Sequence, residues 1–134
     1  MSEISYKLTT DLIYYAENNL KIKPKIGAFI PLKLNKAQLY LHGKLEEQKK
    51  RTGKVRAIIL KGRQQGCSTY VAARFYHRTV KRFAFDTFIF AHDANASDSL
   101  FTMVKNFFEF SYKSEQPALG RSNSKELLFT GLKS

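Results

Sequence analysis

The chain has 134 residues, 43% of them hydrophobic and 13% aromatic, which is enough for one globular domain with its own core. The 23 Lys and Arg against 11 Asp and Glu give a formal charge of +12, which favours a polyanionic partner such as nucleic acid. The single cysteine, Cys67, excludes an internal disulfide and a cysteine-based zinc site, and neither a secretion signal nor an apolar run of bilayer length is present. We therefore expect a cytoplasmic protein.

Two helices are predicted in the first part of the chain. Apolar residues recur at helical spacing over residues 9–20, and residues 21–34 then contain two prolines and a glycine that end this helix. Asn35 is placed to cap a second helix that runs to about residue 51. The buried stripe of this helix is predicted to be Ala37, Leu41 and Leu45. We interpret residues 1–34 as an N-terminal helix and linker, and residues 35–134 as the main domain.

The rest of the chain alternates apolar runs with amphipathic segments. Strands are predicted at residues 55–60, 86–91 and 125–131, and helices at 69–83 and 97–110. The predicted inner faces of these helices are Val71, Ala72, Phe75, Thr79 and Phe83 in the first, and Leu100, Val104, Phe107 and Phe108 in the second. Strands separated by helices of this length predict crossover connections onto a parallel sheet.

A glycine-containing loop, Lys-Gly-Arg-Gln-Gln-Gly-Cys-Ser-Thr at residues 61–69, lies between the first of these strands and its helix. This is the setting of the phosphate loop GxxxxGK(S/T), in which backbone N–H groups hold phosphates, a lysine neutralises them and a hydroxyl binds Mg²⁺. Gly66 and Ser68 match that pattern, whereas Lys61 occupies the position of the first glycine and Cys67 that of the lysine. Two interpretations therefore remain open.

In the first interpretation, Lys61 or Arg63 supplies the missing positive charge, and the arginine offers a planar fork that suits phosphate. In the second, Gly62 and Gly66 only permit a tight turn, and Ser68 caps the helix.

A cysteine beside a predicted helix N-terminus and nearby cations is a candidate nucleophile. However, His42, His77 and His92 lie on separate predicted elements, so no set of nucleophilic partners is evident. We interpret Cys67 as a small residue tolerated near phosphates.

Residues 61–80 resemble the N-terminal ATPase domain of the large terminase subunit of tailed bacteriophages, a motor that drives genome DNA into a procapsid. The shared feature is a variant Walker A motif of the form GRQxGxST. Residues 29–41 are similar to the adenine-recognition segment of that family, and residues 86–109 and 123–134 to its second strand, loop and helix and to the start of its third strand. The resemblance covers roughly residues 25–134.

The resemblance implies an α/β P-loop NTPase fold of the RecA/ASCE type, with a parallel sheet flanked by helices, here incomplete and with an N-terminal helical extension. It implies ATP and Mg²⁺ as cofactors, Ser68 as the Mg²⁺ ligand, and Arg63 assisted by Lys61 as the catalytic cation. The implied nucleotide-binding residues are Gln38, Gly62, Arg63, Gln64, Gln65, Gly66, Cys67, Ser68 and Thr69. Gln38 would read adenine, or it could instead complete a capping box with Asn35.

An apolar strand ending in Asp-Glu, which such ATPases need to hold Mg²⁺ and to activate water, is absent from the 134 residues. Asp93 follows an apolar run, but no second acid follows it, so we do not assign it this role. We likewise interpret His92 as a strand-end residue and not as a general base. The resemblance thus implies the front part of an ATP hydrolase that is inactive by itself, with a nuclease domain in the full-length protein.

A cationic face is predicted on the helix after the loop, formed by Arg74, Arg78, Lys81 and Arg82. It is a candidate DNA contact, although such residues usually serve solubility. The resemblance implies double-stranded DNA, the terminase small subunit and the portal protein as partners, with a homo-oligomeric motor in the host cytoplasm. A non-catalytic basic nucleic-acid-binding domain and a helicase-like ATPase are the alternatives.

Overall fold

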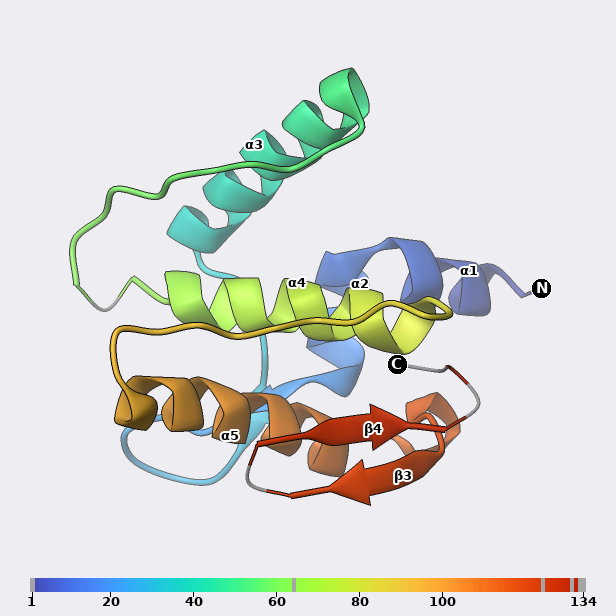
Figure 1. Ribbon diagram of the computed structural model, residues 1–134. Helices are drawn as coiled ribbons and strands as arrows, with labels where there is room; N and C mark the ends of the chain where they lie inside the picture. Colours follow the sequence, from blue (N-terminus) through green and yellow to red (C-terminus); the bar gives the residue numbers. More distant parts are fainter. Residues whose placement is uncertain (1, 64, 124, 131, 133–134) are drawn as a thin grey trace.

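The computed structural model describes residues 2–63, 65–123, 125–130 and 132. Over these residues the fold consists mainly of α-helices, with two short antiparallel hairpins (Figure 1). In chain order the elements are α1 (Glu3–Thr10), α2 (Leu12–Asn19), β1 (Lys21–Ile22), β2 (Ile30–Pro31), α3 (Lys36–Thr52), α4 (Cys67–Lys81), α5 (Ala94–Phe110), the 3₁₀ turn η1 (Lys113–Glu115), β3 (Leu119–Ser122) and β4 (Leu127–Phe129).

Capping side chains decide where the N-terminal helices begin. The helix predicted at residues 9–20 is found as α2, and α1 before it was not predicted. Asp11 separates the two, because its backbone is extended and its Oδ1 accepts a hydrogen bond from the Tyr14 N–H at 3.1 Å. The predicted ends of α3 are confirmed: Asn35 caps its start, and Gly53, in the left-handed conformation with φ of 72°, ends it. Of its predicted buried stripe, Leu45 is buried and Leu41 is half-buried, but Ala37 is exposed. Helices α4 and α5 also occur where the apolar spacing predicted them.

The predicted parallel sheet is wrong. The two sheets of the described residues each contain two antiparallel strands, β1 with β2 and β3 with β4, so the fold is not that of a P-loop NTPase. Residues 55–60 and 86–91 are extended but belong to neither sheet. Of the three predicted strands, only the last is found, as β4, and it pairs with β3, a strand that was not predicted.

The physical reason lies in what surrounds the two extended segments. Ile58 and Leu60 are fully exposed, and Phe90 is 89% exposed, so these side chains are not buried between helices. At Arg56 the backbone is bonded by a side chain instead of a strand: Gln48 Nε2 donates to its carbonyl, and its N–H donates to Gln48 Oε1, both at 2.9 Å. An apolar run identifies strand-like composition, but a sheet also needs neighbouring strands.

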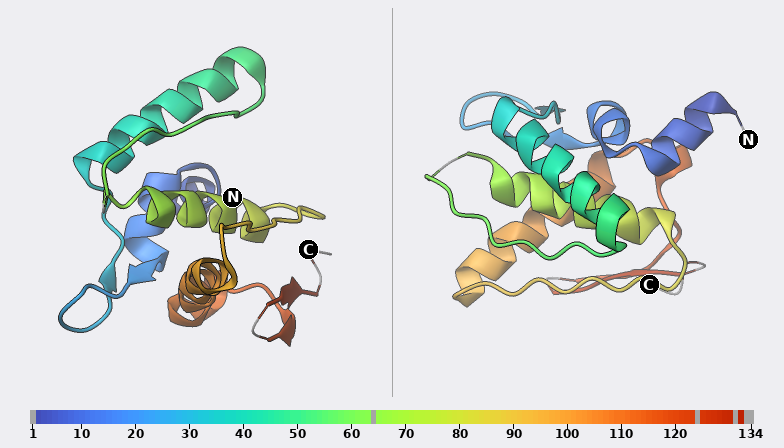
Figure 2. Two further views of the ribbon diagram at one scale, coloured as in Figure 1. Left: turned by 60° about the vertical axis from the view of Figure 1, so that its left-hand side comes forward. Right: turned by 90° about the horizontal axis from the view of Figure 1, so that it is seen from above.

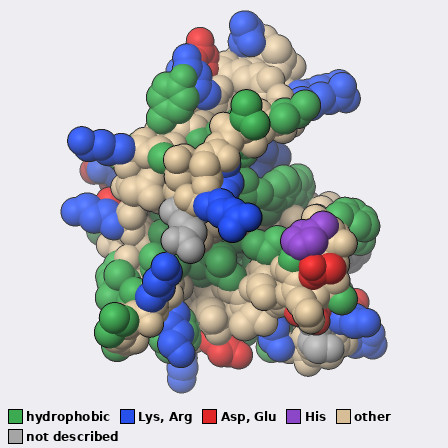
Figure 3. All heavy atoms as spheres, turned by 90° about the vertical axis from the view of Figure 1, so that its left-hand side faces the viewer, with side chains coloured by type: hydrophobic (Ala, Val, Ile, Leu, Met, Phe, Trp, Pro, Cys, Tyr) green, Lys and Arg blue, Asp and Glu red, His purple; other side chains and the backbone are tan. Residues whose placement is uncertain are grey.

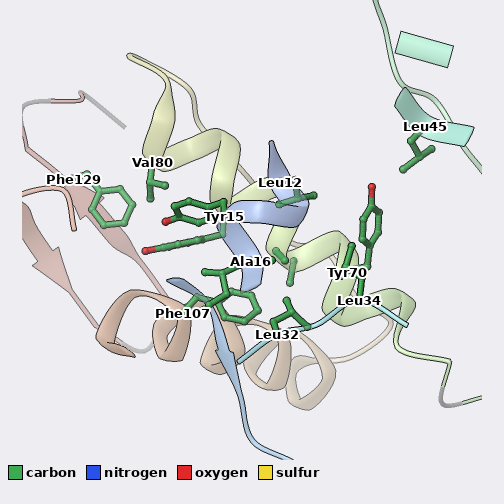
Figure 4. Close-up of a cluster of buried hydrophobic side chains, with 14 residues drawn as sticks. Leu12, Tyr15, Ala16, Leu32, Leu34, Leu45, Tyr70, Val80, Phe107 and Phe129 are labelled. Atoms are coloured by element: carbon green, nitrogen blue, oxygen red, sulfur yellow. The ribbon is translucent and has the colours of Figure 1, made fainter. Parts of the chain in front are cut away.

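The hydrophobic core lies between α2, α4 and α5, with α4 at the centre and α3 projecting from it (Figure 1 and Figure 2). Figure 4 shows Tyr15 and Ala16 of α2 between Val80 of α4 and Phe107 of α5. The largest fully buried side chains are Tyr15, Leu20, Leu32, Tyr70 and Phe107.

The predicted inner face of α4 is partly wrong. Phe75 and Phe83 are exposed, whereas Tyr70, Ala73 and Tyr76 are buried. Phe107 on α5 is buried as predicted. Among the described residues, no helix combines the length and the apolar character needed to cross a membrane.

Candidate functional site

The loop at residues 61–66 leads directly into α4, on the side of the molecule shown in Figure 3. On this face Lys and Arg side chains are widely spread, with hydrophobic side chains visible between them. Lys61, Gly62, Arg63 and Gln65 are exposed, and Lys61 Nζ donates to the Gly62 carbonyl at 3.2 Å. Gln64 lies outside the described residues. The two candidate cations of the loop, Lys61 and Arg63, are therefore both accessible.

Helix α3 holds the end of the loop through Gln38. The Gln38 side chain is only 4% exposed, and its Nε2 donates to the Gly66 carbonyl at 2.8 Å. Its Oε1 accepts from the Asn35 N–H at 2.8 Å, while Asn35 Oδ1 accepts from the Gln38 N–H at 2.9 Å. The capping box is thus present, and it connects α3 to the loop. Adenine recognition by Gln38 stays a prediction, and it would require these bonds to be exchanged.

The N-terminus of α4 differs from those of the other α-helices. Gly66 is its N-cap, in the left-handed conformation with φ of 75°, and no side chain of the described residues caps it. Ser68 lies inside the first turn, so the interpretation of Ser68 as the cap is wrong. The other four α-helices are capped by Ser2, Asp11, Asn35 and Asp93. Within the described part of the chain, the positive end of the α4 dipole therefore lacks a side-chain acceptor.

The first turn of α4 exposes its hydroxyl and buries its thiol. Ser68 is exposed, Thr69 is half-buried, and Cys67 is a free cysteine buried against the protein. The burial of Cys67 agrees with a packing role. The described residues contain no group of three or more His, Cys, Asp or Glu side chains arranged to hold a metal. A Mg²⁺ ion at Ser68 would therefore take most of its ligands from phosphate oxygens and water.

The predicted cationic face of α4 divides into two parts. Arg74 is buried, with its guanidinium 2.6 Å from Glu46 and 3.1 Å from the Tyr70 hydroxyl, and Lys81 is paired with Glu115. Arg78 and Arg82 are not paired with a carboxylate of the described residues. Arg78 is half-buried beside the Phe85 ring, and Arg82 is exposed.

A polar network joins α3 to α4 behind this face. The Tyr70 hydroxyl accepts from Arg74, so its own hydrogen is available to donate to His42 Nδ1 at 2.9 Å. Burial lowers the pKa of His42, and the nearby charge of Glu46 opposes this shift without cancelling it, so burial favours the neutral ring. For Glu46, burial raises the pKa, but the Arg74 hydrogen bond and charge outweigh it and hold the pKa below its usual value.

Sequence reasoning missed the contribution of α3 to this region. His42, Glu46 and Lys49 occur at i, i+4 and i+7, which places them on one face of the helix, and all three are half-buried. That spacing was a usable signal, but only the structure shows that this face is turned toward α4.

Asp93 and His92, which the sequence analysis had considered and not assigned a catalytic role, make contacts with near neighbours in the chain. Asp93 caps α5 by accepting from the Ala96 N–H at 2.7 Å, and His92 pairs with Asp93 at 2.8 Å on the exposed surface.

No protein-family model matches the chain, and no curated protein matches it significantly. The assignment of a function therefore depends on the residues themselves.

Proposed function

We propose that the loop at residues 61–69 binds the phosphates of ATP, and that the protein belongs to a DNA-packaging motor of the kind whose large terminase subunit it resembles. The observation that carries this proposal is the N-terminus of α4. It has no side-chain cap among the described residues, and it follows directly on a loop with two exposed cations, Lys61 and Arg63.

Three features support phosphate binding there. The first-turn N–H groups and the helix dipole favour an anion at this end of α4. Arg63 can approach phosphate oxygens with its planar fork, and Lys61 can add a second positive charge. Ser68 presents its hydroxyl to solvent, where it can meet a Mg²⁺ ion carried by the nucleotide.

The proposal assigns binding, and not hydrolysis, to this loop. Phosphoryl transfer needs acids that position the metal and the attacking water, and the sequence has no apolar strand followed by Asp-Glu. Hydrolysis, DNA translocation and contacts with the portal protein and small subunit would require the complete motor. Under this proposal the isolated chain binds ATP but does not hydrolyse it.

Thermal unfolding with and without Mg²⁺-ATP tests the loop. Wild type should be stabilised by roughly 5–10 °C when ATP is present at about 100 times its Kd. Arg63→Ala should lose most of this shift, and Ser68→Ala should lose the part that depends on Mg²⁺.

Arg56→Ala is the matched control, because Arg56 is an exposed arginine that precedes the loop in the same extended connection. It should keep the full shift. An equal loss of protection in Arg56→Ala and Arg63→Ala would show non-specific attraction of ATP to a basic protein, and would refute the assignment.

A second candidate is a non-catalytic nucleic-acid-binding domain. The charge of +12 favours it, as do Arg78 and Arg82, which have no carboxylate partner among the described residues. This function predicts DNA binding that weakens steeply with salt and is indifferent to ATP and to Ser68→Ala. Fluorescence polarisation of a labelled duplex at several salt concentrations, with and without ATP, separates the two candidates.

A further inference from the structure

A second cationic site lies in a cavity at the other end of α4. The cavity has a volume of about 590 Å³, is open to solvent, and is bordered by the junction of α1 and α2, by α3, and by the C-terminal half of α4. Its lining includes five cations, Lys49, Arg74, Arg78, Lys81 and Arg82, against two carboxylates, Asp11 and Glu46. Arg78 lies roughly 16 Å along the helix from Cys67, at 1.5 Å per residue, so this cavity is separate from the loop.

The two carboxylates of the cavity are already engaged. Glu46 pairs with Arg74 at 2.6 Å, and Asp11 Oδ1 accepts from the Tyr14 N–H as the cap of α2. Lys81 is neutralised by Glu115. Within the described part of the chain, this leaves Lys49, Arg78 and Arg82 without a carboxylate partner.

Lys49 and Arg78 each line the cavity with other cations, whose charges act on them. Burial lowers the pKa of Lys49, the charges of Arg78, Arg82 and Arg74 lower it further, and the charge of Glu46 opposes them. Burial likewise lowers the pKa of Arg78, followed by the charges of Arg82 and Arg74, and the charge of Glu46 again opposes this shift. An anion placed among them would relieve this repulsion, in addition to forming its own charge-assisted hydrogen bonds.

We propose that this cavity binds a phosphate group through Lys49, Arg78 and Arg82. The two arginine forks can each pair with two phosphate oxygens, and Lys49 supplies a point charge from the facing helix. The site extends from the half-buried Lys49 and Arg78 to the exposed Arg82, so a phosphate can enter from solvent. The phosphate can be a backbone phosphate of nucleic acid or a free one, and the experiment distinguishes these sources.

The full chain is titrated with pyrophosphate by isothermal calorimetry, and with a labelled duplex of arbitrary sequence by fluorescence polarisation, in a buffer without phosphate. Lys49→Gln and Arg82→Gln should each weaken binding by about tenfold or more. For DNA, each change should also reduce the slope of log affinity against log salt by about 1. Arg78→Gln should weaken binding by a similar factor. This variant also loses the contact between Arg78 and the Phe85 ring, so if it fails to fold, the Lys49 and Arg82 variants decide the test.

Lys50→Gln and Arg51→Gln are the matched controls, because both residues are exposed cations next to Lys49 on α3 and neither lines the cavity. They should leave the affinity within about twofold. Loss of both ligands in the cavity variants alone assigns the site to nucleic-acid phosphate, and loss of pyrophosphate alone assigns it to a free phosphate. Equal losses in the controls, or no binding of either probe by wild type, would overturn the proposal. Because Arg63→Ala leaves this cavity intact, failure of the loop proposal is seen independently.

Discussion

Replacement of Gly66 by alanine tests the contact between α3 and the loop. Gly66 has φ of +75°, a backbone conformation that residues other than glycine rarely adopt. A Cβ atom at this position would lie 2.6 Å from Gln38 Nε2 and 3.4 Å from Asn35 Nδ2. The added methyl group therefore strains the backbone and displaces the buried amide of Gln38.

Both effects contribute to the expected loss of stability. The left-handed conformation costs about 1–2 kcal/mol for a residue with a Cβ. Moving the Gln38 side chain weakens its bonds to the Gly66 carbonyl and the Asn35 N–H, each with a net contribution of about 0.5–1.5 kcal/mol. We expect Gly66→Ala to lower the free energy of unfolding by about 2–4 kcal/mol.

Urea unfolding followed by circular dichroism measures this change, with Gly43→Ala as the control. Gly43 lies within α3 with nothing within 4 Å of an added Cβ, so its replacement should stabilise the protein by about 0.5–1 kcal/mol. In Gln38→Ala the obstructing amide is absent, and Gly66→Ala should then cost about 1 kcal/mol less. A Gly66→Ala protein as stable as wild type would refute this account of the contact.

Three further outcomes are expected. Phe107→Ala should lower the free energy of unfolding by about 3–5 kcal/mol. Phe90→Ala should change it by less than about 0.5 kcal/mol, because Phe107 is buried and Phe90 is exposed. A large loss of stability in Phe90→Ala would show that Phe90 is buried and would contradict this account. Glu46→Gln should cost about 1–3 kcal/mol, since it leaves the buried guanidinium of Arg74 without its carboxylate, and the loss of stability on acidification below about pH 4.5 should be smaller in this variant. Burial lowers the pKa of His77, so the unfolded state takes up more protons below about pH 6.5 and stability should fall as the pH falls from 7.5 to 5.5; His77→Gln should reduce this fall in urea titrations at the two pH values.

Local sequence signals predicted the helices well, because their boundaries depend on neighbours within a few residues. Asn35, Gln38 and Gly53 specify both ends of α3 through caps that the structure contains. The helix predicted at residues 9–20 matches α2, whose start Asp11 caps, whereas α1, which precedes Asp11, was not predicted.

The predicted strands depended on partners that a local pattern does not contain. Residues 55–60 have the β-branched composition of a buried strand, yet Ile58 and Leu60 are exposed and the backbone at Arg56 is bonded by Gln48. Residues 86–91 are extended in the same way without joining a sheet. The parallel sheet and the P-loop fold were therefore inferred from the composition of these segments, but the segments do not pair with other strands.

The candidate sites divide along the same line. The sequence by itself determined the positive charge, the helix boundaries and the loop with its two cations, because these follow from composition and from contacts between near neighbours. Only the tertiary structure decided which cations of the described residues have a carboxylate partner: it brings Glu46 to Arg74 and Glu115 to Lys81, and it places Lys49 and Arg78 in the lining of one cavity. Charge neutralisation depends on distances of a few ångströms between residues far apart in the chain, and folding alone sets those distances.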